Sequence, residues 1–251
     1  MARIIINADD FGMNVRCSRA IAEAFAKGLI TDTTAMANGE WLAEALMLAR
    51  ERRFDDRIGV HLNLTEGKPL TEKISGFPAF VTDGCFNKCA MRLDRELTDA
   101  EYEAVYTELK AQILRLQSMG ITITHADSHH YIHNSPYFLP VVIQVCREQG
   151  INKIRLRRNL PVTSAAVAAE NNAYHYALHS HGFITTEYFG RPEDIAERKI
   201  PGCTELLVHP DYDRENILID RRGVSDGFPI GERLPDISKT GGVELISYSV
   251  L

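Results

Sequence analysis

The chain has 251 residues, a length that suits one large α/β domain as well as two small ones. Its apolar fraction of 45% and charged fraction of 25% are ordinary for a soluble globular protein with a sizeable core. The formal net charge is −6 without a long basic run, and no apolar run is long enough to cross a bilayer, so we expect neither a nucleic-acid partner nor a membrane protein.

The cysteines bear on the cellular compartment. Only three residues precede the first expected strand, which leaves no room for a signal peptide. The five cysteines are scattered and odd in number, as is usual for the reduced thiols of a cytoplasmic protein. Cys85 and Cys89 have the spacing of half a zinc site, but no second Cys or His pair lies near them in sequence, so free loop thiols are the better interpretation.

The apolar run Ile4–Ile6 predicts a short buried strand that continues into the polar stretch Asn7–Gly12 (NADDFG). Asp9 and Asp10 stand where that strand must end, and Gly12 lets the backbone turn sharply just beyond them. Adjacent carboxylates repel, so a site that keeps both ionised usually holds a cation or shares a proton. A solvated turn is the alternative for such a pair taken alone, but histidines at three later strand ends favour a site.

The next elements alternate between helices and strands. We expect a helix at 17–27, a strand at 31–37 and a helix at 41–53. The strand that follows, 58–64, places apolar residues on one face and His61 and Asn63 on the other. In an open sheet this polar face would meet solvent, whereas in a barrel it would lie in the lumen, near the mouth.

Residues 65–97 show no clear periodicity and contain several Gly and Pro residues. The segment is too long for an ordinary connection, and such segments are usually lids, binding loops or disordered. We expect an inserted loop near the site mouth that contacts substrate or a neighbouring subunit. A capping box at Thr98–Glu101 then opens a helix that ends near Met119.

The sequence 121–124 predicts another strand, which runs into the histidine-rich stretch His125–His133. If the chain stays extended there, one face carries His125, Asp127, His129 and His133. The histidines of this stretch, His130 included, cannot all bind one metal, so at least one lies behind the ligands or at the surface.

The second half of the chain repeats the alternation. We expect a helix at 135–149, a strand at 151–156 that leads to Arg155, Arg157 and Arg158, a helix at 164–180, and strands at 204–208 and 244–248, with a weak pattern at 234–238. His175 and His179 lie four residues apart on one of these helices, but no carboxylate accompanies them, so an exposed helix face is the better interpretation. The strand at 204–208 ends in His209.

Strands that alternate with helices over the whole length predict a parallel sheet with right-handed crossovers. The conspicuous polar groups lie at carboxyl ends of strands, where barrels and open α/β sheets build their sites. Because the sequence has no internal repeat or interdomain linker, we expect one domain, residues 1–251, with a distorted βα-barrel fold.

One Asp and two His form a recurrent ligand set for a catalytic divalent metal that keeps open positions for water and substrate. The strand ends offer Asp10, His61 and His129. Asp9 could take a proton from water at the metal, His209 could protonate the leaving group, and Asp127 could orient a ligand histidine. Each has a structural alternative; His61, for example, could simply satisfy a strand-end carbonyl.

Four stretches carry a family resemblance: Asn7–Gly12, His61–Thr65, Thr124–His129 together with His133, and Glu205–Pro210. In these the sequence resembles the YdjC-like carbohydrate deacetylases, within the wider polysaccharide-deacetylase type of barrel, over nearly the whole chain. The resemblance implies a distorted TIM-like βα-barrel of the glycoside hydrolase/deacetylase type with mostly parallel strands.

The resemblance also implies a site and an activity. One divalent metal ion (magnesium or zinc, with cobalt or manganese as alternatives) would be bound by Asp10, His61 and His129, with Asp9 as base and His209 as acid. Further residues that would contact the ligands or the substrate are His125, Asp127, His133, Arg155 and Asn63. The implied reaction removes an N-acetyl group from a chito-oligosaccharide, often a diacetylated disaccharide or its phosphate, in chitin degradation, and the resemblance is compatible with a homodimer.

Three departures from the family pattern leave this metal set intact. Tyr131 stands where another His is frequent, Asp211 follows His-Pro where Gly is frequent, and the basic motif reads RLRRN at Arg155–Asn159 instead of RLPRE. Two alternatives to the deacetylase therefore stay open: a metal-dependent phosphoester or ester hydrolase, and a non-catalytic metal-dependent sugar-binding regulator. Acetate release, phosphate release or neither would separate the three.

Overall fold

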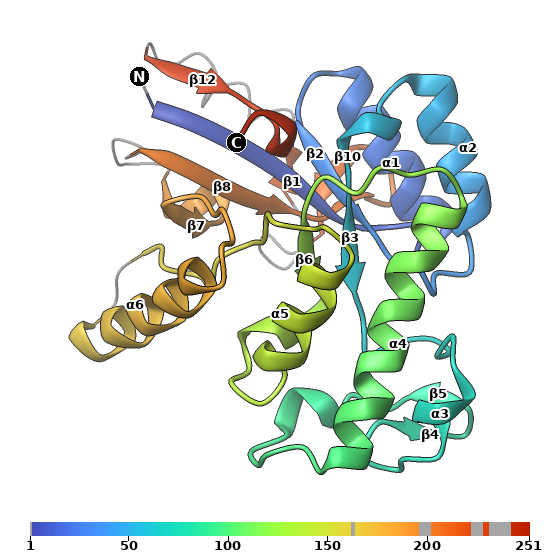
Figure 1. Cartoon of the computed structure of the whole chain (residues 1–251). Helices are drawn as coiled ribbons and strands as arrows, with labels where there is room; N and C mark the ends of the chain where they lie inside the picture. The colour runs from blue at the N-terminus through green and yellow to red at the C-terminus, as the bar shows by residue number, and fades with distance from the viewer. Residues whose placement is uncertain (1, 162–163, 196–201, 222–227, 231–241) are drawn as a thin grey trace.

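A seven-stranded parallel sheet forms the centre of the protein (Figure 1). The structure, a computed structural model, describes residues 2–161, 164–195, 202–221, 228–230 and 242–251. The strands are β1 (Ala2–Phe11), β2 (Asp32–Ala35), β3 (Ile58–Leu62), β6 (Ala126–Ser128), β7 (Tyr188–Gly190), β8 (Cys203–Val208) and β12 (Val243–Leu245). Their order is β6-β3-β2-β1-β8-β7, and β12 pairs with the first residues of β1.

Backbone hydrogen bonds extend the sheet beyond β6 through residues 152–155 and Ile184. Arg155 N donates to Ala126 O at 3.0 Å, and Ile184 N donates to Asn152 O at 2.8 Å. The chain then runs from Ile184 into β7, which pairs with β8. The sheet therefore curls round towards its other edge, and the expected distorted TIM-like barrel with parallel strands is confirmed.

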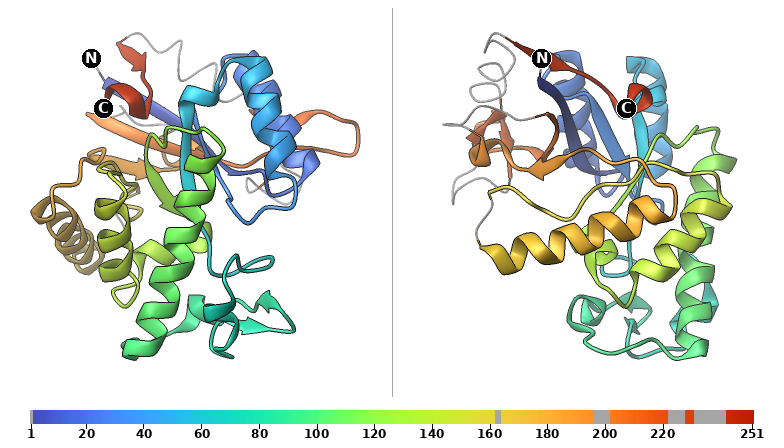
Figure 2. Two further views of the ribbon diagram at one scale, coloured as in Figure 1. Left: turned by 45° about the vertical axis from the view of Figure 1, so that its right-hand side comes forward. Right: turned by 60° about the vertical axis from the view of Figure 1, so that its left-hand side comes forward.

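Helices surround the outside of the curled sheet (Figures 1 and 2). They are α1 (Val15–Ala26), α2 (Leu42–Arg52), α4 (Asp99–Ser118), α5 (Leu139–Glu148) and α6 (Ala165–Ser180). The capping box expected at the start of α4 is present, since Thr98 and Glu101 bond each other's backbone N–H. Within the described ranges, no helix is both long and apolar enough to span a membrane.

The alternation of β1 separates two environments. Ile4, Ile6 and Ala8 pack into the main apolar core, whereas Ile5 belongs to a small separate cluster inside the barrel. Asn7, the next residue on the Ile5 side, hydrogen-bonds to Thr34 of β2 and to His125. The barrel interior is therefore polar above a small apolar base, and the strands deliver charged side chains into it.

Several strand predictions were wrong in position. Residues 121–124 form no strand; β6 begins at Ala126, where Val60 of β3 fixes the register. Only Lys153 and Ile154 of the expected strand 151–156 make bridges, and β7 was not predicted. The closing strand ends at Leu245 and is followed by the short helix η5 (Tyr248–Val250), while 234–238 lies outside the described residues. The bounds of these strands depend on backbone pairing with strands distant in the sequence, which local hydrophobic patterns do not reveal.

The segment 65–97 has structure of its own. It contains α3 (Glu72–Ser75), the hairpin β4 (Val81–Thr82) and β5 (Cys85–Phe86), and the short helix η2 (Cys89–Arg92). This part lies beside the first half of α4 (Figure 2), where the Glu108 carboxylate accepts hydrogen bonds from Leu70 N and Thr71 N. Cys85 and Cys89 are free thiols, and none of the described clusters that could hold a metal contains a cysteine.

The remaining β-structure is a small antiparallel sheet of β9 (Pro210–Tyr212), β10 (Leu218–Asp220) and β11 (Phe228–Pro229). It follows β8 directly, so it extends the chain from the carboxyl end of the barrel. β9 also lies close to α1, where the Tyr212 hydroxyl donates to Glu23. Other short helices are η1 (Asp55–Arg57), η3 (His129–Asn134) and η4 (Pro192–Asp194).

Tyr248 closes the end of the barrel where the strands begin. Its fully buried ring packs with Ile5 and stacks on the His125 ring at 3.7 Å between centroids. Its hydroxyl donates to Glu205 Oε2 at 2.5 Å, and its carbonyl accepts from Lys153 Nζ. Tyr248 therefore links β1, β8 and His125 at this end of the barrel.

We expect Tyr248→Ala to lower the free energy of unfolding by about 3–5 kcal/mol, the range for truncation of a buried aromatic side chain. Tyr248→Phe should lower it by about 1–3 kcal/mol, because Glu205 would lose a buried donor. Urea unfolding followed by circular dichroism measures both. The control is Tyr176→Ala, whose side chain is 76% exposed. If Tyr248→Ala unfolds at the same urea concentration as the control, the closing role is contradicted.

Candidate metal centre

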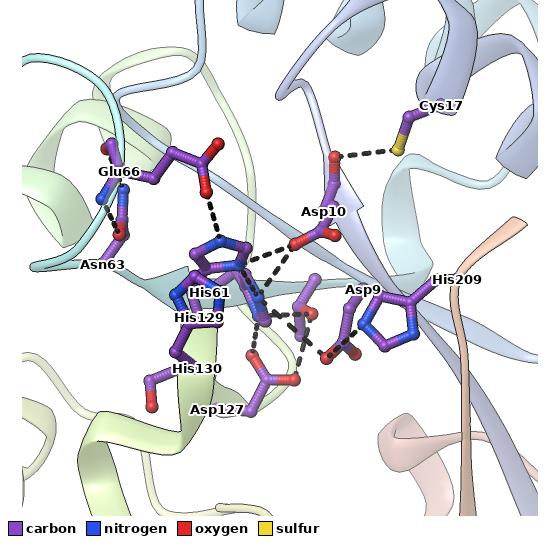
Figure 3. Close-up of polar contacts among 12 residues, drawn as sticks. Asp9, Asp10, Cys17, His61, Asn63, Glu66, Asp127, His129, His130 and His209 are labelled. Atoms are coloured by element: carbon purple, nitrogen blue, oxygen red, sulfur yellow. Dashed lines mark hydrogen bonds and ion pairs between the residues drawn. The ribbon is translucent and has the colours of Figure 1, made fainter. Parts of the chain in front are cut away.

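Three buried side chains from separate strand ends converge on one point (Figure 3). Asp10 comes from the end of β1, His61 from β3, and His129 follows β6 directly. The Asp10 Oδ1 atom lies 2.9 Å from His129 Nδ1 and 3.3 Å from His61 Nε2, and the two nitrogens lie 3.3 Å apart. The structure therefore brings together the three residues considered as metal ligands from the sequence.

These separations suit a shared cation. Two ligand atoms each about 2.1 Å from one ion lie about 3.0 Å apart at a right angle and about 3.4 Å apart at the tetrahedral angle. Asp10 Oδ1 is buried and its contacts are with the two imidazole nitrogens, so its charge is directed at the point between them. The residues present thus fit a divalent metal ion.

The backbone at the end of β1 explains how adjacent carboxylates serve one site. Asp10 adopts a left-handed conformation with φ of 71°, and Gly12 follows with φ of 83°. Left-handed φ is unfavourable for a residue with a side chain, and such strain is commonly retained at functional sites. In an extended strand Asp9 and Asp10 would face opposite sides, and this turn directs both towards the barrel mouth.

His61 is held by a carboxylate behind it. Its Nδ1 lies 2.6 Å from Asp127 Oδ1, which leaves Nε2 directed at Asp10. Thr34 donates to the other oxygen of Asp127 at 3.1 Å. Burial by itself would lower the pKa of His61, but the charges of Asp127 and Asp9 raise it to about 10. A carboxylate that fixes a histidine ring is the usual arrangement at metal sites, and a cation would compete with the proton that this acidic surrounding favours.

Arg155 lies at the bottom of the site and is fully buried. Its guanidinium contacts both oxygens of Asp9 at 2.8 and 2.9 Å, Asp127 at 2.6 Å and Glu205 at 2.7 Å. Burial opposes ionisation of Asp9, but Arg155, helped by His61 and His209, outweighs it and holds the pKa of that carboxyl below its ordinary value. Arg155 thus binds carboxylates within the protein and keeps Asp9 ionised.

The neighbouring arginines are engaged as well. Arg157 pairs with Glu170 at 2.9 Å, and Arg158 pairs with Asp194 at 2.7 Å. Each of these two arginines therefore already has a carboxylate partner within the protein.

His209 completes the cluster on the far side of Asp9. Its Nε2 lies 4.0 Å from Asp9 Oδ2, and the same oxygen lies 4.0 Å from His61 Nε2. His209 is largely buried and its backbone N–H donates to Asp220 of β10. Asp9 therefore stands between the candidate ligands and His209.

His125 and His133 lie away from the Asp10 cluster, in the protein interior. His125 is hydrogen-bonded to Asn7 and Thr124, and burial lowers its pKa well below the ordinary value. His133 Nδ1 contacts Ser128 Oγ at 2.6 Å, and burial lowers the pKa of His133 to about 3. Both are neutral structural imidazoles of the interior at neutral pH.

Four residues of this centre were not recognised in the sequence as site candidates: Thr34, Glu66, Glu205 and Arg221. Glu66 contacts His129, and Arg221 contacts the second oxygen of Asp10 at 3.0 Å. Glu66 and Arg221 come from irregular stretches without periodicity. Glu205 lies in a stretch already matched to the family, and the only signal for it was a charged residue inside an otherwise apolar strand. Asn63, a predicted candidate, is buried and holds the backbone of Glu66.

The fold and the cluster together define a βα-barrel protein with a buried His/Asp centre that could hold a metal ion. The chain belongs to the YdjC-like protein family, whose sequence model matches residues 3–236.

Two solved structures are similar over nearly their whole lengths. One, from Enterococcus faecalis V583, is described as a "putative cellobiose-phosphate cleavage protein"; it has a TM-score of 0.73 and 23% identity, with 99% of this chain and 98% of that chain covered. The other, the lactam utilization protein from Thermus thermophilus, has a TM-score of 0.51 and 14% identity, with 98% and 99% covered. At these identities the likeness concerns the fold.

We expect His61→Ala and His129→Ala each to abolish stoichiometric binding of a divalent metal, because each removes one of three converging ligand atoms. His175→Ala is the matched control: His175 lies on α6 and contacts Thr185 and His179. Metal content after dialysis, measured by plasma emission spectroscopy on folded protein, tests this. Full occupancy in either of the first two variants would show that the ligand assignment is wrong.

Proposed function

We propose that this protein hydrolyses the N-acetyl group of N-acetylated sugars in a metal-dependent reaction. The observation that supports this most is the position of Asp9, which lies between three converging ligand atoms and His209. A protein that only bound a sugar through a metal would need neither a buried carboxylate nor a second imidazole beside the ligands.

Each residue has a defined part in the proposed reaction. Asp10, His61 and His129 would hold the divalent ion, which when bound would supply Lewis acidity for the hydrolysis. Asp9 is ionised because Arg155 binds both its oxygens, and it accepts the proton that the attacking water loses.

The acid step falls to the opposite side of the site. His209 Nε2 lies 4.0 Å from Asp9 and gives a proton to the nitrogen of the departing amine. One residue thus removes a proton from the water and another protonates the amine, which is a poor leaving group unless it is protonated. Acetate and a free amino sugar are the products.

Two observations bear on the choice between an N-acetylated sugar and a phosphoester as substrate. One is the family, and the other is that the arginines near the site already bind carboxylates of the protein. The resemblance to carbohydrate deacetylases favours N-acetylated sugars such as chito-oligosaccharides. The similar Enterococcus faecalis protein is named for a sugar phosphate, so a phosphorylated oligosaccharide belongs in any substrate test. Phosphoester cleavage itself is less well supported, because the buried Arg155 binds carboxylates within the protein.

An acetate-release assay tests the proposal. Metal-free protein is incubated with N,N′-diacetylchitobiose, with its phosphate and with p-nitrophenyl phosphate, and then with Mg²⁺, Zn²⁺, Co²⁺ or Mn²⁺ added back. The proposal expects acetate from at least one sugar, and only with metal. Inorganic phosphate without acetate would favour the phosphoester hydrolase, and bound metal and sugar without either product would favour the non-catalytic regulator.

Asp9→Asn and Asp10→Asn should separate base from ligand. Asp10→Asn should weaken metal binding and turnover together, since it removes a charged ligand. Asp9→Asn should keep the metal and the fold, because Asp127 and Glu205 still balance Arg155, but lose on the order of 10²–10⁴ in kcat, the usual contribution of a general base. Metal content and turnover are measured on the same preparations.

Two outcomes would contradict these roles. Loss of metal in Asp9→Asn with retention in Asp10→Asn would mean that the two roles are reversed. Near-normal turnover in both variants would refute the catalytic interpretation of the motif.

A further inference from the structure

The second nitrogen of His129 is directed at a carboxylate outside the proposed ligand set. His129 Nδ1 lies 2.9 Å from Asp10 Oδ1, and His129 Nε2 lies 3.1 Å from Glu66 Oε2 (Figure 3). We infer that Glu66 is a positioning residue of the metal centre, which accepts the Nε2–H of His129 and so directs Nδ1 at the ion. This inference rests on the proposed metal site.

Each candidate imidazole ligand then turns one ring nitrogen to the site and bonds a carboxylate through the other, but the two histidines use opposite nitrogens. His61 turns Nε2 to the site and gives Nδ1–H to Asp127, whereas His129 turns Nδ1 to the site and gives Nε2–H to Glu66. A carboxylate behind a metal-bound imidazole fixes the tautomer and makes the ligand nitrogen more basic. Asp127 does this from a buried strand, and Glu66 does it from the start of the segment 65–97.

Glu66 is held in place through its backbone. Asn63 Nδ2 donates to Glu66 O at 2.6 Å, and Asn63 Oδ1 accepts from Glu66 N at 3.1 Å. Asn38 Nδ2 donates to the same carbonyl at 2.9 Å, and Gln112 of α4 fixes the backbone of Asn63. These amides are buried, so the position of Glu66 is set before any ion binds.

The Glu66 side chain itself reaches the surface. It is 43% exposed, and Lys88 Nζ of the segment 65–97 lies 4.0 Å from its Oε2. Replacement of Glu66 therefore removes a contact to His129 without opening a cavity in the core. This makes a change in metal affinity separable from a loss of folding.

Glu66 has a competing role that the same test distinguishes. Glu66, His129 and His130 could together hold a second ion, and His129 would then have to bind metal through both nitrogens. Thr65 Oγ1 already contacts His130 Nδ1 at 2.9 Å, and Lys88 lies beside the carboxylate. A single ion at the Asp10 cluster, with Glu66 accepting the Nε2–H of His129, leaves the contacts of His130 and Glu66 unchanged.

Calorimetric titration of metal-free full-length protein with Zn²⁺ tests the inference. Glu66→Ala should bind one ion per chain about 10–100-fold more weakly than the unaltered protein. Glu66→Gln should recover most of this loss, because its amide oxygen can accept the same N–H. Glu103→Ala is the matched control, since Glu103 is an exposed carboxylate paired with one lysine, Lys73, and it should bind Zn²⁺ normally. Thermal melting should be the same for all metal-free variants.

Each other outcome overturns the inference. Unchanged Zn²⁺ affinity in Glu66→Ala would show that His129 needs no partner. Two ions in the unaltered protein and one in Glu66→Ala would show that Glu66 is a ligand of a second ion. Equal losses in Glu66→Ala and Glu66→Gln would rule out the hydrogen bond as the cause. Zn²⁺ binding to none of the proteins would refute the proposed metal site as well, which separates that failure from the failure of Glu66 alone.

Discussion

The buried ion pairs of Arg155 are the interaction on which the rest of the site depends. Asp9, Asp127 and Glu205 all lie inside the barrel, where ionised carboxylates are strongly disfavoured unless they are paired. Arg155 binds all three, and each then has a second partner: Asp9 faces His209, Asp127 fixes His61, and Glu205 accepts from Tyr248. The Arg155 guanidinium therefore positions the proposed base Asp9, the carboxylate behind the candidate ligand His61, and the Glu205–Tyr248 contact at the closed end of the barrel.

The barrel interior holds more carboxylates than arginines, since Arg155 alone faces Asp9, Asp127 and Glu205. Burial raises the pKa of Glu205 to about 7, so even with Arg155 the interior tolerates its full charge poorly. Towards the mouth Asp10 adds another carboxylate, which contacts Arg221 and the imidazoles of His61 and His129. A bound divalent ion would balance this excess, which is a physical reason for a metal in a site whose hydrogen bonds are otherwise nearly complete. Stability and metal binding are in this sense coupled.

Candidate ligands that stand at strand ends could be predicted from the sequence. Contacts between side chains of different strands could not, because they depend on how the strands are arranged in the barrel. Asp10, His61 and His129 follow strands, so their convergence could be expected from a parallel sheet. Asp127 was predicted to orient a ligand histidine, but the sequence could not show that this histidine is His61, because the contact depends on the register of β6 against β3. Arg155 was expected near substrate, since a basic residue at a strand end gives no sign of three carboxylates facing it. Glu66 lies in a stretch without periodicity, where local patterns carry no information.

Anomalous diffraction from crystals grown with Zn²⁺ would show whether Asp10, His61 and His129 form one metal centre. We expect one strong zinc peak per chain, about 2.0–2.2 Å from Asp10 Oδ1, His61 Nε2 and His129 Nδ1. A peak bound instead by Glu66 and His130, or no peak at the Asp10 cluster while zinc is bound elsewhere in the chain, would contradict it.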